Sequence, residues 1–250
     1  MTASPRGRTG RAAVLGVVCA ALGAALVGCG AEEDPDQGTN GVGRLTAAQI
    51  EKKALAAAGR ADSVRLTGAV VSQGRTYRLA MQLSDEGGRG RVTTPGATYE
   101  LLRVGEDLFL KADAEFWASD DKPSETDEAA AGKLEDKYVR VPEGDPAYKR
   151  LRFFTERETL LDGLLTLHGT KAKGERTKVD GVRTIEVSGD KGAGGSFDVA
   201  LEGTPFPLRV ERGGDAGTIG LADWGEPLRL EPPAEDETLD YGKQLPTGKD

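Results

Sequence analysis

The chain has 250 residues, of which 33 are basic and 41 acidic, for a formal net charge of −8, and only 5% are aromatic. An acidic chain of this kind is not expected to bind nucleic acid. Its length suits one domain with a sizeable core, which must be mainly aliphatic because aromatic residues are so few.

The first 28 residues have the organisation of an export signal. Three arginines up to Arg11 precede sixteen uncharged residues, from Ala12 to Val27. This length is typical of a signal-peptide core and short for a transmembrane helix. The residues from Leu26 to Cys29 (LVGC) resemble the lipobox of bacterial lipoproteins, which implies cleavage before Cys29 and acylation of its sulfur. We therefore expect a protein anchored by lipid to the extracytoplasmic face of the cell membrane, since two or more acyl chains suffice for stable anchoring.

Removing residues 1–28 takes away three arginines and Cys19, so the mature chain carries 30 basic and 41 acidic residues, a net charge of −11. This charge argues against electrostatic binding to anionic lipid, so membrane attachment is expected to depend on Cys29 alone. With Cys29 acylated, no thiol remains for a disulfide, a metal site or a nucleophile. The acidic residues near Asp36 lack the spacing of a calcium loop, and we expect no metal or cofactor.

Residues 29–44 are rich in Gly, Asp and Glu and are predicted to form a flexible tether behind the lipidated cysteine. A helix is predicted over Ala47–Ala58. Thr46 and Gln49 have the spacing of a capping box, and Gly59 is placed to end the helix.

From Ser63 the apolar residues alternate with a period of two, which predicts strands with one buried face. Five strands follow one another through short turns, which predicts an antiparallel meander. They are centred on Val64–Val70, Tyr77–Leu83, Val92, Thr98–Val104 and Leu108–Ala112.

An acidic insertion, Ser119–Glu128, is predicted to be an exposed loop that leads into a weak helix over 127–134. A short strand at Tyr138–Val141 follows. The most apolar helix is predicted over Glu156–Leu167, with Thr155 and Glu158 as its capping box. Because an internal glycine disfavours this helix by about 1 kcal/mol, tertiary contacts must stabilise it.

The remaining residues predict strands again, at Thr170–Thr177, Val182–Ser188, Phe197–Leu201, Leu208–Arg212, Thr218–Trp224 and Leu228–Glu231. Asp180-Gly181 predicts a tight hairpin turn. The glycine run at Gly192–Gly195 lacks the lysine and the helix of a phosphate-binding loop. Residues 234–250 are predicted to be an acidic flexible tail, so the folded domain is expected to span 45–233.

This order of elements predicts an α+β fold with ten or eleven antiparallel strands and two or three helices. A sheet that wide must twist and curl, forming either a closed barrel or a half-barrel whose concave face the helices cover. Because so few helices leave room in a half-barrel, we expect an apolar cavity. Its predicted lining consists of Leu79, Met81, Leu101, Leu160, Leu161, Leu164 and Leu165.

Several of these features together resemble the actinobacterial lipoprotein family typified by LppX and LprG. They are the lipobox, the tether, the capped helix, the meander ending near Phe116-Trp117, and the stretch DWGEPLRL from Asp223 to Leu230 followed by Pro232. The resemblance implies the half-barrel of the LolA and LolB lipoprotein carriers, with a hydrophobic cavity that carries lipids or acylated glycolipids. The chain departs from this pattern in its acidic insertion and its few aromatic residues, so no cargo is carried over.

An enzymatic function is disfavoured. His168 is the only histidine, and its position at the predicted end of the leucine-rich helix suits a cap. No nucleophile elbow of the G-x-S-x-G type is present. The alternative to a lipid carrier is an interaction or sensor module that uses the same fold to signal to a protein partner of the envelope. Extractable lipid distinguishes the two, because a carrier purifies with an acyl ligand.

Overall fold

The computed structural model describes residues 35–117 and 131–240. The predicted export signal, Cys29, the insertion at Ser119–Glu128 and residues 241–250 lie outside this range. All the elements described below lie within one compact unit, Asp36–Asp250. Within the described residues, no helix is long and apolar enough to cross a membrane.

Helix α1 (Ala47–Arg60) forms as its local signals predict. Gln49 donates its backbone N–H to Thr46 Oγ1 at 3.4 Å, and Thr46 N–H donates to Gln49 Oε1 at 3.1 Å, which completes the capping box. Ile50, Ala54 and Ala58 lie on one face and are buried. The helix continues past Gly59 to Arg60, so it ends two residues later than predicted.

Within residues 35–117 and 131–240, twelve strands form one sheet, one more than the upper estimate from the sequence. Their spatial order is β12-β6-β5-β4-β3-β2-β1-β11-β10-β9-β8-β7. Their bounds are β1 Ser63–Ser72, β2 Arg75–Ser84, β3 Gly87–Thr94, β4 Ala97–Val104, β5 Asp107–Ala112, β6 Tyr138–Val141, β7 Lys171–Val179, β8 Val182–Gly189, β9 Ser196–Ala200, β10 Pro207–Glu211, β11 Gly217–Ala222 and β12 Thr238–Asp240.

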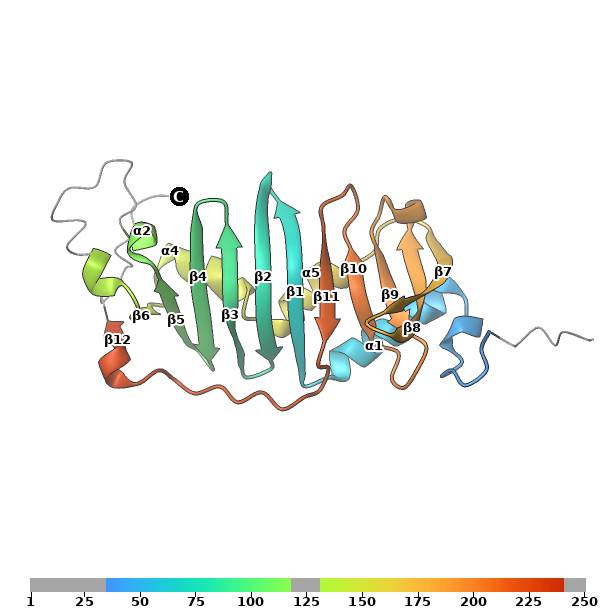
Figure 1. Cartoon of the computed structure of the whole chain (residues 1–250), viewed down its shortest axis with the longest axis horizontal. Helices are drawn as coiled ribbons and strands as arrows, with labels where there is room; N and C mark the ends of the chain where they lie inside the picture. Colours follow the sequence, from blue (N-terminus) through green and yellow to red (C-terminus); the bar gives the residue numbers. More distant parts are fainter. Residues whose placement is uncertain (1–34, 118–130, 241–250) are drawn as a thin grey trace, which may run out of the picture. The chain divides into compact units, whose positions relative to one another are not determined.

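The sheet consists of two antiparallel meanders that meet in the middle. The first runs from β1 to β6, the second from β7 to β11, and β1 pairs with β11 from Arg65↔Ala222 to Val70↔Gly217. Figure 1 shows the two ends of the sheet, β12 and β7, far apart, so the curved sheet is not closed into a barrel. This confirms the predicted half-barrel.

The sheet is mixed, and in this respect the expectation of a purely antiparallel sheet was wrong. β12 pairs with β6 in parallel, from Thr238↔Tyr138 to Asp240↔Arg140. β12 lies in the segment predicted to be a loose tail, whereas Leu228–Glu231, predicted to be a strand, runs without regular structure. The edge of β6 offers unpaired backbone groups, and β12 satisfies them although its own three residues carry little strand signal.

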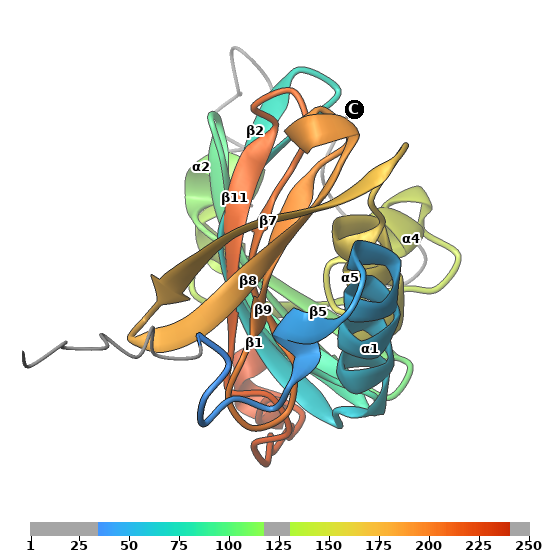
Figure 2. The same cartoon turned by 90° about the vertical axis from the view of Figure 1, so that its right-hand side faces the viewer.

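Three helices cover one face of the sheet, as Figure 2 shows: α1, α4 (Pro146–Phe153) and α5 (Arg157–Leu165). We call them the helix layer. The sequence did not predict α4, although Asp145 accepts a hydrogen bond from Ala147 N–H at 2.7 Å and Pro146 occupies the first turn, both ordinary start signals. The short elements are α2 (Ala114–Trp117), η1 (Val42–Arg44), η2 (Asp190–Gly192) and η3 (Glu235–Glu237).

Helix α5 is shorter than the predicted Glu156–Leu167, and its predicted capping box is absent. Its N-cap is Glu156, which makes no side-chain cap. The Thr155 hydroxyl donates to Arg152 O at 2.8 Å and accepts from Arg103 Nε at 3.1 Å. The hydroxyl is therefore engaged by the preceding helix and by the sheet, and it is not available to the first turn of α5.

The segment before α1 is attached to the domain, although residues 29–44 were predicted to be a tether. Asp36 forms ion pairs with Arg176 at 2.7 Å and Arg44 at 3.4 Å. Asn40 donates its backbone N–H to Leu201 O at 2.8 Å, and Val42 is buried in the core. Residues 36–44 thus belong to the folded domain, because Val42 and Asp36 find partners at the β7–β9 end of the sheet.

Candidate functional site

The seven residues predicted to line a cavity are brought together between the sheet and the helix layer. Leu79 and Met81 come from β2 and Leu101 from β4, while the four leucines come from α5. All seven have exposed fractions between 0% and 6% and belong to one hydrophobic cluster. The face that they share is therefore the inner, apolar face of the half-barrel.

Strand β3 presents almost no side chains to this inner face. Gly90 pairs with Met81 on one side and with Leu101 on the other. A Cβ atom at Gly90 would lie 2.7 Å from Met81 Sδ, and one at Gly88 would lie 2.5 Å from Leu83 Cδ2. The flexible side chains of β2 therefore occupy the space that the two glycines leave. Methionine is suited to filling such space because its unbranched side chain adapts easily.

The next set of paired residues on the inner face ends with an aromatic side chain, that of Tyr99. Leu79, Val92 and Tyr99 pair side by side across β2, β3 and β4. Burial raises the pKa of the Tyr99 hydroxyl to about 12, so it stays neutral at physiological pH. This part of the inner face is consequently uncharged and suits an apolar occupant.

Buried arginines fix the start of α5. Arg157, 7% exposed, donates to Asp85 Oδ1 through Nε at 2.8 Å and through Nη2 at 2.5 Å, and to Ala58 O through Nη1 at 3.1 Å. These bonds join α5 to the β2–β3 turn and to the end of α1. Removal of the Arg157 side chain would remove these three hydrogen bonds, including the one that joins α5 to the end of α1.

Arg103 and Arg152 hold the α4–α5 junction on the sheet. Arg103 donates to Thr155 O through Nη2 at 2.9 Å and to Gly105 O through Nη1 at 2.6 Å. Burial lowers the pKa of Arg103 from its ordinary value, and the nearby Arg152 acts in the same direction. The hydrogen bonds that Arg152 donates to Glu106 and to Glu156 raise the pKa of Arg152.

We call Arg103, Arg152 and Arg157 the arginine clamp. Sequence reasoning missed it, although one signal was available. Arg103 follows Tyr99 and Leu101 at a spacing of two, which places a charge on the buried face of a strand. A charge at such a position must be paired, and this requirement pointed to a specific contact with another element.

The other end of α5 is held mainly by backbone acceptors. Arg212 Nη1 donates to Gly163 O at 2.9 Å, and Lys171 Nζ donates to Leu167 O at 2.5 Å. His168 lies beyond the C-cap Thr166, and its backbone N–H donates to Gly194 O at 3.0 Å. The imidazole is therefore not needed to cap α5, contrary to the expectation. No cluster of three potential metal ligands occurs among the described residues.

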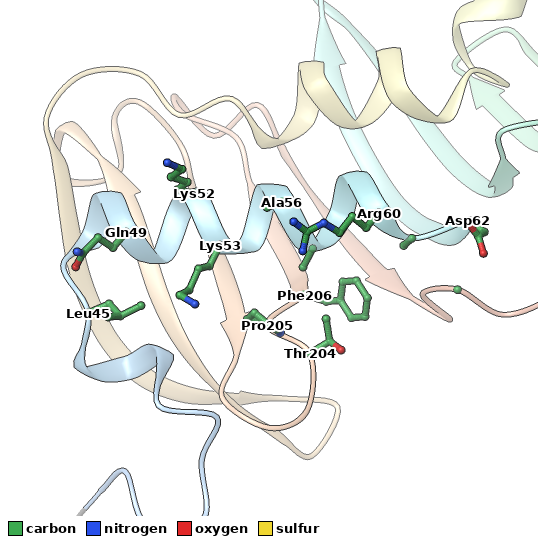
Figure 3. Close-up of a pocket in the computed structure, with 13 residues that line it drawn as sticks. Leu45, Gln49, Lys52, Lys53, Ala56, Arg60, Asp62, Thr204, Pro205 and Phe206 are labelled. Carbon is green, nitrogen blue, oxygen red and sulfur yellow. The ribbon is translucent and has the colours of Figure 1, made fainter.

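Two surface grooves accompany this interior. One, of about 730 Å³, lies beside α1 and the β9–β10 loop, and Figure 3 shows the side chains around it. The other, of about 780 Å³, is lined by Arg65, Arg89, Arg91 and Arg229 together with residues near Gly90. The leucines of α5 line neither groove, and the groove beside α1 shares no residue with the seven predicted lining residues. The second groove, in contrast, is lined in part by Met81 and Leu101.

Comparison with solved structures identifies a protein with a similar fold. No family model and no curated protein matched the chain. Among solved structures, LprF from Mycobacterium bovis is 16% identical with a TM-score of 0.53, over 75% of this chain and 97% of LprF. The lipoprotein LppX of Mycobacterium tuberculosis is 15% identical with a TM-score of 0.43, over 74% and 98% of the two chains. From the similarity to LprF, and from its own curved, unclosed sheet with a helix layer on one face, the chain has an LprF-like half-barrel fold.

Proposed function

We propose that the chain is an exported lipoprotein, acylated at Cys29 and held at the extracytoplasmic face of the cell membrane, that binds or carries an acyl lipid or glycolipid. The lipid would lie between α5 and strands β2–β4. The observation that carries the proposal is the inner face itself, where four leucines of a short helix cover a strand that contributes glycine at two inward positions.

Movement of α5 away from the sheet would expose apolar surface from both sides. Exposed apolar surface costs about 25 cal/mol for each square ångström, and an acyl chain that covers it recovers the same amount. A lipid can therefore replace the contacts between α5 and the sheet without a large change in free energy. The arginine clamp would keep the start of α5 in place during this exchange.

The LprF-like fold supports this proposal. We assign no catalytic role, because the seven residues at the centre of the inner face are all apolar and the neighbouring Tyr99 hydroxyl is neutral. The alternative is an envelope interaction or sensor module with the same fold and no lipid cargo.

Native mass spectrometry with organic extraction tests the carrier proposal. The chain from Gly30 onward, produced without acylation, should contain a lipid or take one up. Leu161→Trp, which fills the inner face, should reduce uptake, whereas Leu55→Trp on the exposed side of α1 should not. A protein that is fully folded, empty and unable to bind acyl probes would refute the carrier and favour the interaction module.

The anchor requires a separate experiment. Cys29→Ser in the full chain should release the protein from the membrane fraction after a carbonate wash. Retention of the variant in the membrane would place the anchor elsewhere.

A further inference from the structure

The groove beside α1 has an apolar floor. We call it the α1 groove. Leu45, Ala56 and Ala57 form one side, and Pro205 and Phe206 of the β9–β10 loop form the other (Figure 3). The small alanine side chains leave a hollow of about 730 Å³ between helix and loop.

Three cations surround this floor. Lys53 extends toward Pro205, Arg60 lies above Phe206, and Lys52 stands on the outer side of α1 (Figure 3). None of the three side chains has an ion-pair partner within the described part of the chain. Asp62 is the one acidic residue in the lining, so the groove carries a formal charge of +2 on a chain whose net charge is −8.

An aromatic pair stiffens the loop side of the groove. Phe206 stacks on Trp224 with ring centroids 5.0 Å apart and an interplanar angle of 4°. Trp224 Nε1 donates to Pro207 O at 3.0 Å, which fixes the pair on the start of β10. Aromatic rings beside unpaired lysine and arginine are the combination that proteins place at the boundary between lipid headgroups and acyl chains.

We propose that the α1 groove docks on an anionic phospholipid of the bilayer. Its cations bind the phosphate, and its apolar floor covers the adjoining part of the lipid. This inference rests on the proposed function only in placing the chain at a membrane. The groove is separate from the inner face, so docking does not require a cargo.

The negative charge of the whole chain does not prevent this contact. At physiological ionic strength the Debye length is about 8 Å, so acidic groups elsewhere on the surface are largely screened. The cations of the groove would lie in contact with the lipid headgroups, well within one Debye length, so their attraction to the phosphates is screened much less. In addition, Pro35 is six residue steps from Cys29, a reach of about 20 Å at most, which keeps the described domain near the acyl anchor.

Vesicle flotation tests the proposal with the chain from Gly30 onward, so that the anchor makes no contribution. Wild-type protein should bind phosphatidylcholine vesicles in which about one lipid in three is the anionic lipid phosphatidylglycerol. It should bind neutral phosphatidylcholine vesicles far more weakly. Each cation near an anionic surface changes binding about fivefold, so Lys52→Gln, Lys53→Gln and Arg60→Gln together should weaken binding about 100-fold.

A control with the same change in charge isolates the groove. Arg75→Gln, Arg78→Gln and Lys178→Gln together remove three exposed cations of β2 and β7 and should weaken binding less than fivefold. Equal losses in the two triple variants, equal binding to neutral vesicles, or no binding by the wild type would each overturn the proposal. Lipid extraction is a separate readout: an empty interior with intact vesicle binding refutes the carrier alone, and a loaded interior without vesicle binding refutes docking alone.

Discussion

Leu164→Asp tests whether α5 is packed on the sheet. Leu164 is 6% exposed and belongs to the core cluster. Loss of its burial costs about 1.5–3 kcal/mol. A carboxyl group in the same place must either lose its hydration or bind a proton, and protonation at pH 7 of a group with an ordinary pKa of about 3.9 costs about 4 kcal/mol. The free energy of unfolding should therefore fall by about 6 kcal/mol at pH 7.

The same reasoning predicts a dependence on pH. The buried carboxyl has a pKa raised above its value in the unfolded chain, so it is protonated in the folded state. The variant then loses stability as pH rises above about 4, and its difference from the wild type should shrink to about 3 kcal/mol near pH 4.

Urea unfolding followed by circular dichroism, at pH 7 and at pH 4, measures both effects. Leu164→Ala, expected to cost about 2–4 kcal/mol, keeps the test informative if the aspartate variant does not fold. Leu55→Asp, on the exposed side of α1, is the control and should change stability by less than about 1 kcal/mol. A loss of less than 1 kcal/mol for Leu164→Asp, equal at both pH values, would show that α5 faces solvent and would refute the reasoning.

Three further predictions concern α5, the clamp and the N-terminal segment. Gly163→Ala should stabilise the protein by about 0.5–1 kcal/mol in urea unfolding, because nothing lies within 4 Å of the added Cβ atom and alanine favours a helix; a destabilised variant would contradict this. Arg103→Met should cost about 2–3 kcal/mol in the same assay, because Thr155 O loses a charged donor; a neutral effect would show that the clamp is dispensable. Although desolvation opposes it, hydrogen bonds from Arg176 and Arg44 hold the pKa of Asp36 below its ordinary value, so the attachment of residues 36–44 is present above that ordinary pKa and is lost as pH falls through the lowered one. Asp36→Asn should lower the amide protection factors of this segment at pH 7 to those that the wild type has at acidic pH, and unchanged protection factors would refute the role of the ion pairs.

Elements that depend on neighbouring residues could be predicted from the sequence. The capping box of Thr46 and Gln49 starts α1, and the alternation of apolar residues produces the strands. Asp180 and Gly181 both have positive φ, at 49° and 85°, which is the backbone that their predicted tight turn requires. The burial of the seven residues predicted to line a cavity also follows from periodicity, because each lies on the apolar face of its element.

Features that depend on distant partners were decided by the tertiary structure. Thr155 has the spacing of a capping box, yet its hydroxyl accepts from Arg103, which lies 52 residues away in the sequence. β12 becomes a strand because β6 has an unpaired edge. Residues 36–44 are ordered because Asp36 meets Arg176 across 140 residues. The secondary-structure propensity of a short segment does not depend on residues so far away in the sequence, so it could not predict these contacts.

The charge of the α1 groove likewise depends partly on the sequence and partly on the tertiary structure. The sequence determines a net charge of −11 for the chain without residues 1–28, and this charge argues against binding to anionic lipid. Helical periodicity places Lys53, Ala56 and Arg60 on one side of α1, and this much is local. Only the fold brings the β9–β10 loop, with Phe206, against that side and creates an apolar hollow with unpaired cations. The net charge counts every charged residue of the chain, whereas binding depends on the charges within about one Debye length of the lipid. The tertiary structure determines which charged residues lie that close.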